Sequence, residues 1–309
     1  MASVTLAESA KLAQDDLVAG VIESLITVNE MFQLLPFDGI DGNALAYNRE
    51  NALGDVQMAG VGTLITAKNP ATFTQVSSTL TTIIGDAEVN GLIQATRSGD
   101  GNDQTAVQVA SKAKSVGRKY QDQMINGDGT GNQFVGLMGL VPASQTIFAG
   151  GDAANGAPLS LGDLDALIDL VTDRDGHVDF IMMPRRTRRA YYALLRQLGG
   201  TSPGDIYTMP NGQQQIAYRG IPILANDYIP TTQVRGTATN ATTIFAGNFD
   251  DGSRTSGIVG LTASNAAGIQ VKNLGEKEDA DEEITRVKWY CGFALFSERG
   301  IAALKGVTN

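Results

Sequence analysis

The chain has 309 residues, 42% hydrophobic and 18% charged, so it can bury a substantial core in one large domain or two modest ones. Its 33 acidic residues outnumber 23 basic ones, giving a formal net charge of −10, which argues against a basic protein that coats nucleic acid. The single cysteine excludes an intramolecular disulfide and multi-cysteine metal sites. One histidine, 6% aromatic residues and 36 glycines indicate a chain rich in loops and turns and argue against an enzyme.

The first third of the chain changes from helical to extended patterns. A capping box at Thr5 and Glu8 precedes apolar residues at helical spacing, which predicts a helix over residues 6–29. Residues 44–84 have no helical period and contain β-branched runs such as Gly62–Ala67 and Ala71–Leu80. These runs predict a long, extended β-hairpin with little core of its own, which needs a partner surface.

A long helix and an α/β region follow. Asp103 can cap a helix that runs to about Ile125 and is stopped by the glycines of residues 127–131. Beyond it, the pattern predicts further elements, which are listed here in chain order: a helix from Ser160 and Asp163, a buried strand Val178–Met183, a helix Arg185–Leu198, strands Ile221–Ala225 and Thr243–Ala246, a closing strand Glu283–Phe296 and a short helix Glu298–Lys305.

Targeting and membrane signals are missing from the sequence. The first 17 residues lack a basic region followed by an apolar block, as a secretory signal would have. No stretch approaches the ~18 consecutive apolar residues that cross a bilayer. We therefore expect a soluble protein that is made in a reducing cytoplasm and has no membrane partner.

The glycine-rich stretch after the long helix has two functional interpretations and one structural one. As a phosphate loop it lacks the Gly-Lys-Ser/Thr ending. As a calcium loop it has Leu137 where a bidentate carboxylate is required. We therefore favour a structural turn made by Gly127, Asp128, Gly129 and Gly131, and predict no metal and no cofactor.

A hydrolytic triad is the one enzymatic hypothesis that the sequence offers. His177 would serve as the base and Ser202, within Gly200-Thr-Ser-Pro-Gly204, as the nucleophile. This motif follows a predicted helix rather than a strand. Pro203 also removes the backbone N–H that an oxyanion hole would use. We favour the structural interpretation, in which residues 200–204 form a flexible loop and His177 lies at the start of a strand. No catalytic residue is assigned.

Two segments concentrate charge. Arg185, Arg186, Arg188 and Arg189 begin one predicted helix, and residues 276–283 hold six carboxylates. Phosphate contact for the first and metal binding for the second are weaker interpretations than solvated surfaces, given the net negative charge. A third interpretation pairs them between neighbouring subunits, and the candidate residues for this pairing are Arg185, Arg186, Arg189, Glu278, Asp281 and Glu282.

The order of these elements resembles that of the major capsid proteins of tailed bacteriophages, the Hong Kong 97-type fold. The similarity is carried by a series of short motifs: Met124–Asn132 with Gly136 and Leu137, Met183-Pro184 before a helix, Gly220-Ile-Pro222, Phe245-Ala-Gly-Asn-Phe249, and the closing segment Arg286–Leu304. The match is collinear over nearly the whole chain. Each motif is short, and their ordered combination is what makes the likeness specific.

The resemblance implies an α+β subunit, L-shaped, in four parts. Residues 1–43 would form an N-terminal helix and arm, and residues 44–80 an extended β-hairpin loop that lies across a neighbour. Residues 81–152 and 270–309 would form a peripheral domain with a long spine helix. Residues 153–269 would form an axial domain.

The same resemblance implies a function. The chain would self-assemble as hexamers and pentamers of an icosahedral head that encloses double-stranded DNA without sequence-specific binding, in a virion built in the host bacterial cytoplasm. A separate scaffolding protein, a portal protein and in some relatives a decoration protein would be its partners. An encapsulin-like compartment holding a cargo enzyme is the alternative.

The extended loop carries the expected contacts between subunits, through Tyr47, Arg49, Leu64, Ile65, Lys68 and Phe73. Some members of the family lock the shell with a lysine–asparagine bond. Lys68 lies in the loop, but the sequence identifies neither a partner asparagine nor an assisting carboxylate. The cross-link is therefore not predicted.

Overall fold

The computed structural model describes residues 30–97, 103–151, 154–173, 176–197, 206–208, 212 and 214–308. The helix predicted over residues 6–29 lies outside these residues, as does Ser202. The helices are α2 (Glu30–Leu34), α3 (Gly91–Arg97), α4 (Gln104–Asn126), α5 (Leu137–Leu140), α6 (Leu161–Thr172) and α7 (Arg185–Gln197), with 3-10 turns η1 (Ala143–Gln145), η2 (Ala149–Gly151), η3 (Ser264–Ala266) and η4 (Glu298–Gly300). None of the described helices combines the length and apolarity that a bilayer span needs.

Three sheets organise the strands. The hairpin pairs β2 (Ala44–Ala52) with β3 (Thr72–Thr79). A five-stranded sheet has the order β1 (Phe37–Ile40), β12 (Ile258–Ala263), β14 (Ala280–Leu295), β13 (Gln270–Lys277), with β4 (Thr81–Asn90) also on β14. An eight-stranded sheet has the order β5 (Thr146–Phe148), β15 (Ile301–Val307), β11 (Ala238–Gly247), β6 (Phe180–Met183), β9 (Ile221–Ala225), β8 (Gln214–Tyr218), β7 (Ile206–Thr208), with β10 (Gln233–Arg235) on β11.

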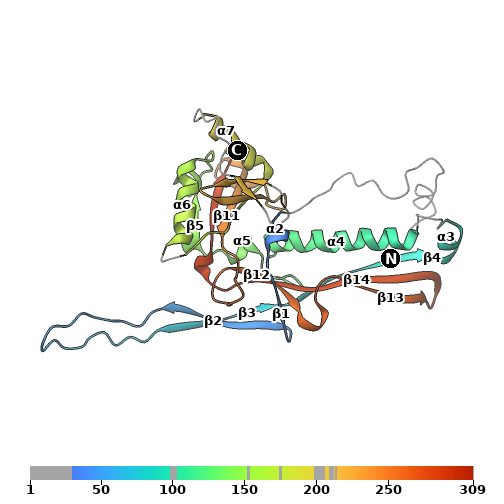
Figure 1. Cartoon of the computed structure of the whole chain (residues 1–309), viewed down its shortest axis with the longest axis horizontal. Helices are drawn as coiled ribbons and strands as arrows, with labels where there is room; N and C mark the ends of the chain where they lie inside the picture. Colours follow the sequence, from blue (N-terminus) through green and yellow to red (C-terminus); the bar gives the residue numbers. More distant parts are fainter. Residues whose placement is uncertain are drawn as a thin grey trace.

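The sheets give the subunit an elongated, L-like outline (Figure 1). The helix α4 and the long strand β14 run side by side along one arm, and α4 covers one face of the β4–β14 pair. The eight-stranded sheet, with α6 and α7, stands as a second lobe. The β2–β3 hairpin projects from the junction of the two, away from α4.

The predicted long helix is confirmed, and the structure shows why it begins and ends where it does. The carboxylate oxygen Oδ1 of Asp103 accepts from the backbone N–H of Thr105 at 2.9 Å and of Ala106 at 3.4 Å, which satisfies N–H groups that the first turn leaves unpaired. At the other end, a Cβ on Gly127 would lie 2.2 Å from the carbonyl oxygen of Phe134. Only glycine allows the chain to turn back this closely.

An aromatic group joins α4 to the five-stranded sheet. Tyr120 of α4 is fully buried, and its ring centroid lies 4.6 Å from that of Trp289 on β14. Phe37 of β1 lies 5.7 Å from Tyr120 and 5.6 Å from Trp289. Gly260 of β12 leaves the space for this packing, because a Cβ there would lie 2.5 Å from the Phe37 ring.

The closing strand has the predicted alternation. Thr285, Val287, Trp289 and Cys291 of β14 are buried, and the residues between them are partly exposed. Burial raises the pKa of the Cys291 thiol to about 12. Its thiolate form, which is the reactive one, is therefore suppressed at neutral pH in the folded subunit.

One predicted element was wrong, and the predicted β-hairpin is confirmed with strands shorter than the β-branched runs suggested. The short helix over Glu298–Lys305 is instead the turn η4 followed by strand β15, whose residues Ile301–Leu304 are fully buried between β5 and β11. Alanine and leucine favour a helix locally, but the hydrogen bonds and burial of a central strand outweigh that preference. The run Gly62–Ala67 forms no strand, because β2 ends at Ala52 and β3 begins at Thr72.

The strand pairings cross the expected domain boundaries at several places. β12, expected in the axial domain, pairs with β14 in the five-stranded sheet, and β1, expected in the N-terminal arm, pairs with β12. β5 and β15, both expected in the peripheral domain, belong to the eight-stranded sheet. The last two strands therefore connect the two lobes, since β14 and β15 are separated only by the turn around η4.

Two glycine substitutions test this packing. We expect Gly260→Ala to lower the free energy of unfolding by about 1–3 kcal/mol, because its new methyl group meets the Phe37 ring. Gly117→Ala is the matched control on α4, where a Cβ meets nothing within 4 Å, and we expect it to raise stability by about 0.5–1 kcal/mol. Urea unfolding followed by circular dichroism measures both. Equal effects of the two substitutions would contradict the packing described here.

Candidate inter-subunit surface

The tip of the extended hairpin exposes a concentration of large apolar side chains. They are between 62% and 111% exposed and comprise Leu53, Val56, Met58, Val61, Leu64, Ile65 and Phe73. Singly exposed apolar residues are common on protein surfaces, but a group of this size in one loop marks an interaction site. Figure 1 shows that the hairpin points away from both lobes, so these residues have no neighbouring core in their own subunit.

The loop between the two strands is nevertheless ordered by its own polar groups. The side-chain oxygen of Gln57 accepts from the backbone N–H of Thr66 at 2.7 Å and of Ala67 at 2.9 Å, and its amide donates to the carbonyl of Leu64 at 3.0 Å. The backbone N–H of Asp55 donates to the carbonyl of Asn69 at 3.0 Å. These bonds replace the strand ladder beyond residue 52 and hold the apolar side chains on a preformed tip.

The structure divides the six predicted loop residues into two groups. Leu64, Ile65 and Phe73 are exposed apolar residues, and Lys68 is exposed beside them. Tyr47 and Arg49 instead contact their own subunit at the base of the hairpin. The Tyr47 hydroxyl donates to the carbonyl of Leu295 at 2.7 Å, and Arg49 Nε donates to the carbonyl of Phe296 at 2.9 Å.

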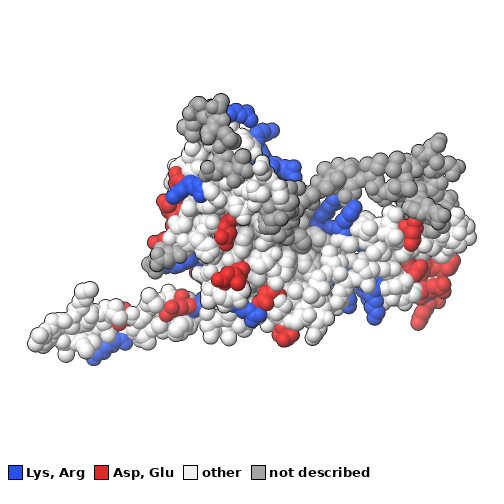
Figure 2. All heavy atoms as spheres, viewed as in Figure 1, with Lys and Arg blue, Asp and Glu red and all other residues white. Residues whose placement is uncertain are grey.

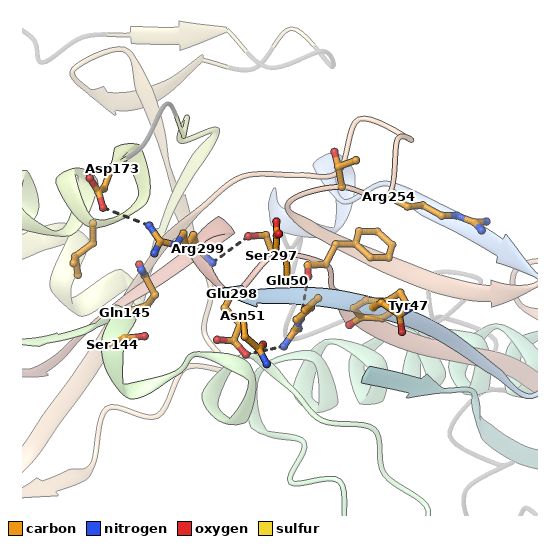
Figure 3. A pocket seen from close by; sticks show the side chains of 15 residues that line it. Tyr47, Glu50, Asn51, Ser144, Gln145, Asp173, Arg254, Ser297, Glu298 and Arg299 are labelled. Carbon is orange, nitrogen blue, oxygen red and sulfur yellow. Dashed lines mark hydrogen bonds and ion pairs between the residues drawn. The ribbon is translucent and has the colours of Figure 1, made fainter. Parts of the chain in front are cut away.

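A polar cleft of about 820 Å³ lies beside this base. Figure 3 shows its lining, which combines hairpin residues, the end of α6 and residues 296–299; labelled examples are Glu50, Asp173, Glu298 and Arg299. Arg49 and Glu298 form an ion pair at 3.0 Å, and Arg299 and Asp173 form another at 3.5 Å. The lining contains neither a histidine nor a cysteine, so this cleft lacks the usual base for nucleophilic catalysis.

The predicted charge-pairing residues lie far apart within one subunit. Figure 2 shows basic side chains on the lobe that carries α7, and acidic ones at the distant end of the β13–β14 hairpin. Arg186 forms hydrogen bonds within its own subunit, since its guanidinium donates to the carbonyls of Thr231 and Asn240 at 3.2 and 2.5 Å. Arg185 forms an ion pair with Asp227 at 2.9 Å.

Most of the other residues predicted for charge pairing are exposed to solvent. Arg189 is exposed on α7, and Glu278 and Asp281 are exposed around the turn from β13 to β14. Glu282 lies 3.7 Å from Lys277 on the paired strand. Any contact between the basic and acidic groups must therefore join different copies of the chain, and it would use Arg189 and Glu278 most readily.

The glycine turn after α4 is closed by its own aspartate. Asp128 Oδ1 accepts from the Thr130 backbone N–H at 2.9 Å and from its hydroxyl at 2.8 Å, and these bonds lower the pKa of the Asp128 carboxyl. Gly129 and Gly131 have φ values of +72° and +60°, in the left-handed region that favours glycine. Over the described residues, no group of three or more potential metal-binding side chains is found.

The histidine of the hydrolase hypothesis is an exposed residue. The His177 side chain is 64% exposed, and its Nε2 lies 3.5 Å from Asp179. Its proposed nucleophile, Ser202, lies outside the described residues. The geometry therefore assembles no triad around this histidine among the described residues.

Comparison with known proteins identifies the family. A model of the phage capsid family matches residues 10–265, which is most of the chain. The chain belongs to the phage capsid family. It is accordingly a structural protein with the Hong Kong 97-type fold, assembles with copies of itself, and is not an enzyme.

Solved structures of this fold match over nearly the full length. The SrpI encapsulin of Synechococcus elongatus PCC 7942 is 19% identical, with a TM-score of 0.75 over 99% of this chain and 97% of that chain. The capsid protein of a native GTA particle is 13% identical, with a TM-score of 0.67 over 99% of both chains. The major capsid protein of Phage G, determined with its decoration protein, is 10% identical, with a TM-score of 0.63 over 100% of both. Curated proteins gave no match.

Substitution tests whether the apolar side chains of the tip are needed for assembly. We expect Leu64→Ser combined with Ile65→Ser to prevent assembly while changing the free energy of unfolding of the subunit by less than about 0.5 kcal/mol, because both side chains are exposed. Size-exclusion chromatography and urea unfolding measure the two effects. The control is Val234→Ser, because Val234 is also an exposed apolar residue (72% exposed) but lies on strand β10 at the eight-stranded sheet, outside the hairpin. An equal loss of assembly in the control would mean that the tip has no special role.

Proposed function

We propose that this chain is the major capsid protein of a tailed double-stranded DNA bacteriophage. The observation that carries the proposal is the preformed apolar tip, which the subunit cannot bury by itself, in a member of the phage capsid family. Hexamers and pentamers of the chain would close into an icosahedral head. The chain would then be found in the virion, after assembly in the host bacterial cytoplasm and without a membrane.

The proposed contacts are head-to-tail. A self-complementary patch would join two copies and stop, whereas a projecting element that seats on a different surface of the next copy continues around a ring. The hairpin spanning residues 44–80 has this projecting geometry (Figure 1). Many such contacts, each modest in strength, stabilise a closed shell together because every subunit is held by several neighbours at once.

The proposal also assigns parts and partners. The lobe with α4 and most of the five-stranded sheet would be the peripheral domain, and the lobe with α6 and α7 the axial domain that gathers at capsomer centres. A separate scaffolding protein would guide assembly, a portal protein would occupy one vertex, and a decoration protein would be an optional addition. The net charge of −10 would leave the packaged DNA mobile, since an acidic wall does not attract phosphates.

An encapsulin-like compartment is the second candidate, and one observation favours it. The SrpI encapsulin matches with a TM-score of 0.75, above the 0.67 of the GTA capsid and the 0.63 of Phage G. This likeness concerns the fold, which both kinds of shell share. The proposed phage role and the compartment role differ in what the shell contains and in whether the chain closes a shell unaided.

The contents of the particle distinguish the two roles. We expect the chain expressed alone to give irregular or open assemblies in negative-stain microscopy, because a phage shell depends on scaffolding. Particles from phage-producing cells should carry nuclease-protected double-stranded DNA. Uniform closed shells formed by the chain alone, filled with protein and free of DNA, would favour the compartment. A chain that remains monomeric under all these conditions would contradict both.

The charge pairing between copies is a further part of the proposal. We expect Arg189→Glu to weaken assembly and Glu278→Lys in the same chain to restore it, because the exposed pair is then reversed but still complementary. Arg196→Glu, an exposed arginine on the same helix, is the matched control. Light scattering at several salt concentrations measures assembly. Unchanged assembly and salt response in Arg185→Glu and Arg189→Glu would remove this contact from the proposal.

A further inference from the structure

The base of the β2–β3 hairpin is fastened to residues 295–298 by two side chains. Arg49 donates from Nε to the carbonyl of Phe296 at 2.9 Å, from Nη2 to the carbonyl of Leu295 at 2.5 Å, and from Nη1 to Glu298 at 3.0 Å. The Tyr47 hydroxyl donates to the same Leu295 carbonyl, and its ring packs edge-on against Phe296 with centroids 5.2 Å apart. The Arg49 side chain is only 15% exposed, although the hairpin around it is largely open.

The same short segment is also fastened to the other lobe. Next to Glu298, the Arg299 guanidinium lies 3.5 Å from Asp173 at the end of α6. The Ser297 hydroxyl accepts from the backbone N–H of Arg299 at 3.3 Å, which fixes the turn between the two ion pairs. Figure 3 shows these side chains meeting in the cleft. Two consecutive residues therefore hold the hairpin on one side and α6 on the other.

The hairpin is also held where β3 continues into β4 after one residue and where Leu45 and Leu80 pack against a small buried cluster. Among the described residues, the side-chain hydrogen bonds that join β2 or β3 to the rest of the subunit come from Tyr47 and Arg49. Twelve residues separate Arg49 from Val61 in the loop, and at about 3.3 Å per residue an extended chain of that length spans roughly 40 Å at most. A rotation of about 10° at Arg49 would move the end of strand β2 at Ala52 by about 2 Å and the far end of the loop by up to about 7 Å. A small rotation of the hairpin at Arg49 therefore produces a larger displacement of the tip.

We propose that Arg49, supported by Tyr47, is a positioning residue that sets the direction of the extended loop relative to the α6 lobe and thereby the angle between neighbouring subunits. This inference rests on the proposed seating of the tip on the next copy. Arginine suits the position because its planar guanidinium fork places N–H donors on three separate nitrogens, each facing its own acceptor, whereas a lysine carries its three N–H donors on one atom. Fixing the loop before contact also reduces the ordering cost of assembly.

The anchor is tested with Arg49→Lys and Arg49→Ala in the full-length chain. Hydrogen exchange of peptides covering residues 44–52 and 72–79 in the purified chain reports the hairpin, and negative-stain microscopy of particles made in phage-producing cells reports particle diameter. We expect both variants to raise hairpin exchange at least ten-fold and to broaden the diameters or leave open sheets. Lysine should fail to rescue, since charge alone does not reproduce the fork. Lys119→Ala, which removes an exposed ion pair on α4, is the control and should change neither readout.

A second measurement separates a positioning effect from loss of the fold. Cys291 is buried on β14, so its alkylation at pH 8 should stay as slow in both Arg49 variants as in the unchanged chain. Hairpin exchange that stays unchanged in both variants would overturn the proposal. Particles lost in Arg49→Ala with unchanged hairpin exchange would also overturn it, because Arg49 would then be a direct contact with the neighbour. If the unchanged chain forms no particles in phage-producing cells, the proposed function fails, while hairpin exchange in the purified chain still decides whether Arg49 is an anchor.

Discussion

The central constraint on this structure is that one subunit leaves a group of large apolar side chains in contact with water, because its own core does not cover them. Seven large apolar side chains lie in the hairpin and its tip, and all of them are largely exposed. Because the hydrophobic effect scales with the apolar area removed from water, burying this group against a second copy gives assembly a driving force without any change in the subunit's own core. The two lobes, by contrast, are well packed: one buried cluster is shared between the two sheets, with Trp289 and Phe245 among its members, and a second lies within the lobe of the eight-stranded sheet.

The junction of the two lobes determines the direction in which the hairpin and its apolar side chains project. The last two strands are divided between the sheets, with β14 in one and β15 in the other, so the turn between them belongs to both lobes. Arg49 and Tyr47 attach the hairpin to this same turn. A small cluster of buried residues, which includes Ile40 and Leu261 with Tyr47 and Leu80 packed against it, supports the attachment from below. The place where the hairpin leaves the subunit is therefore held by both polar and apolar contacts with the lobes, whereas the tip is ordered by hydrogen bonds within its own loop.

The family comparison and the geometry answer different questions. The family match covers residues 10–265 and makes the chain a shell protein. Solved relatives at 10–19% identity share its fold, and the fold alone does not distinguish a viral head from a protein-filled compartment. The features that bear on assembly come from the side-chain contacts of this chain, namely the tip held by Gln57 and the arginine anchor near the base of the hairpin.

The sequence by itself determined those elements whose causes are local. Asp103 with the glycines after Asn126 was sufficient to place α4, the alternation of residues 284–291 was sufficient to orient β14, and the β-branched runs with no period were sufficient to indicate an exposed hairpin. The sequence did not determine β15, because Ala302 and Ala303 favour a helix until two neighbouring strands supply hydrogen bonds and burial. It also could not separate Arg49 from Lys68, two cations in one extended loop. Only the tertiary structure brings carbonyls from residues about 250 positions later to one of them, and such long-range pairing leaves no signal in local composition.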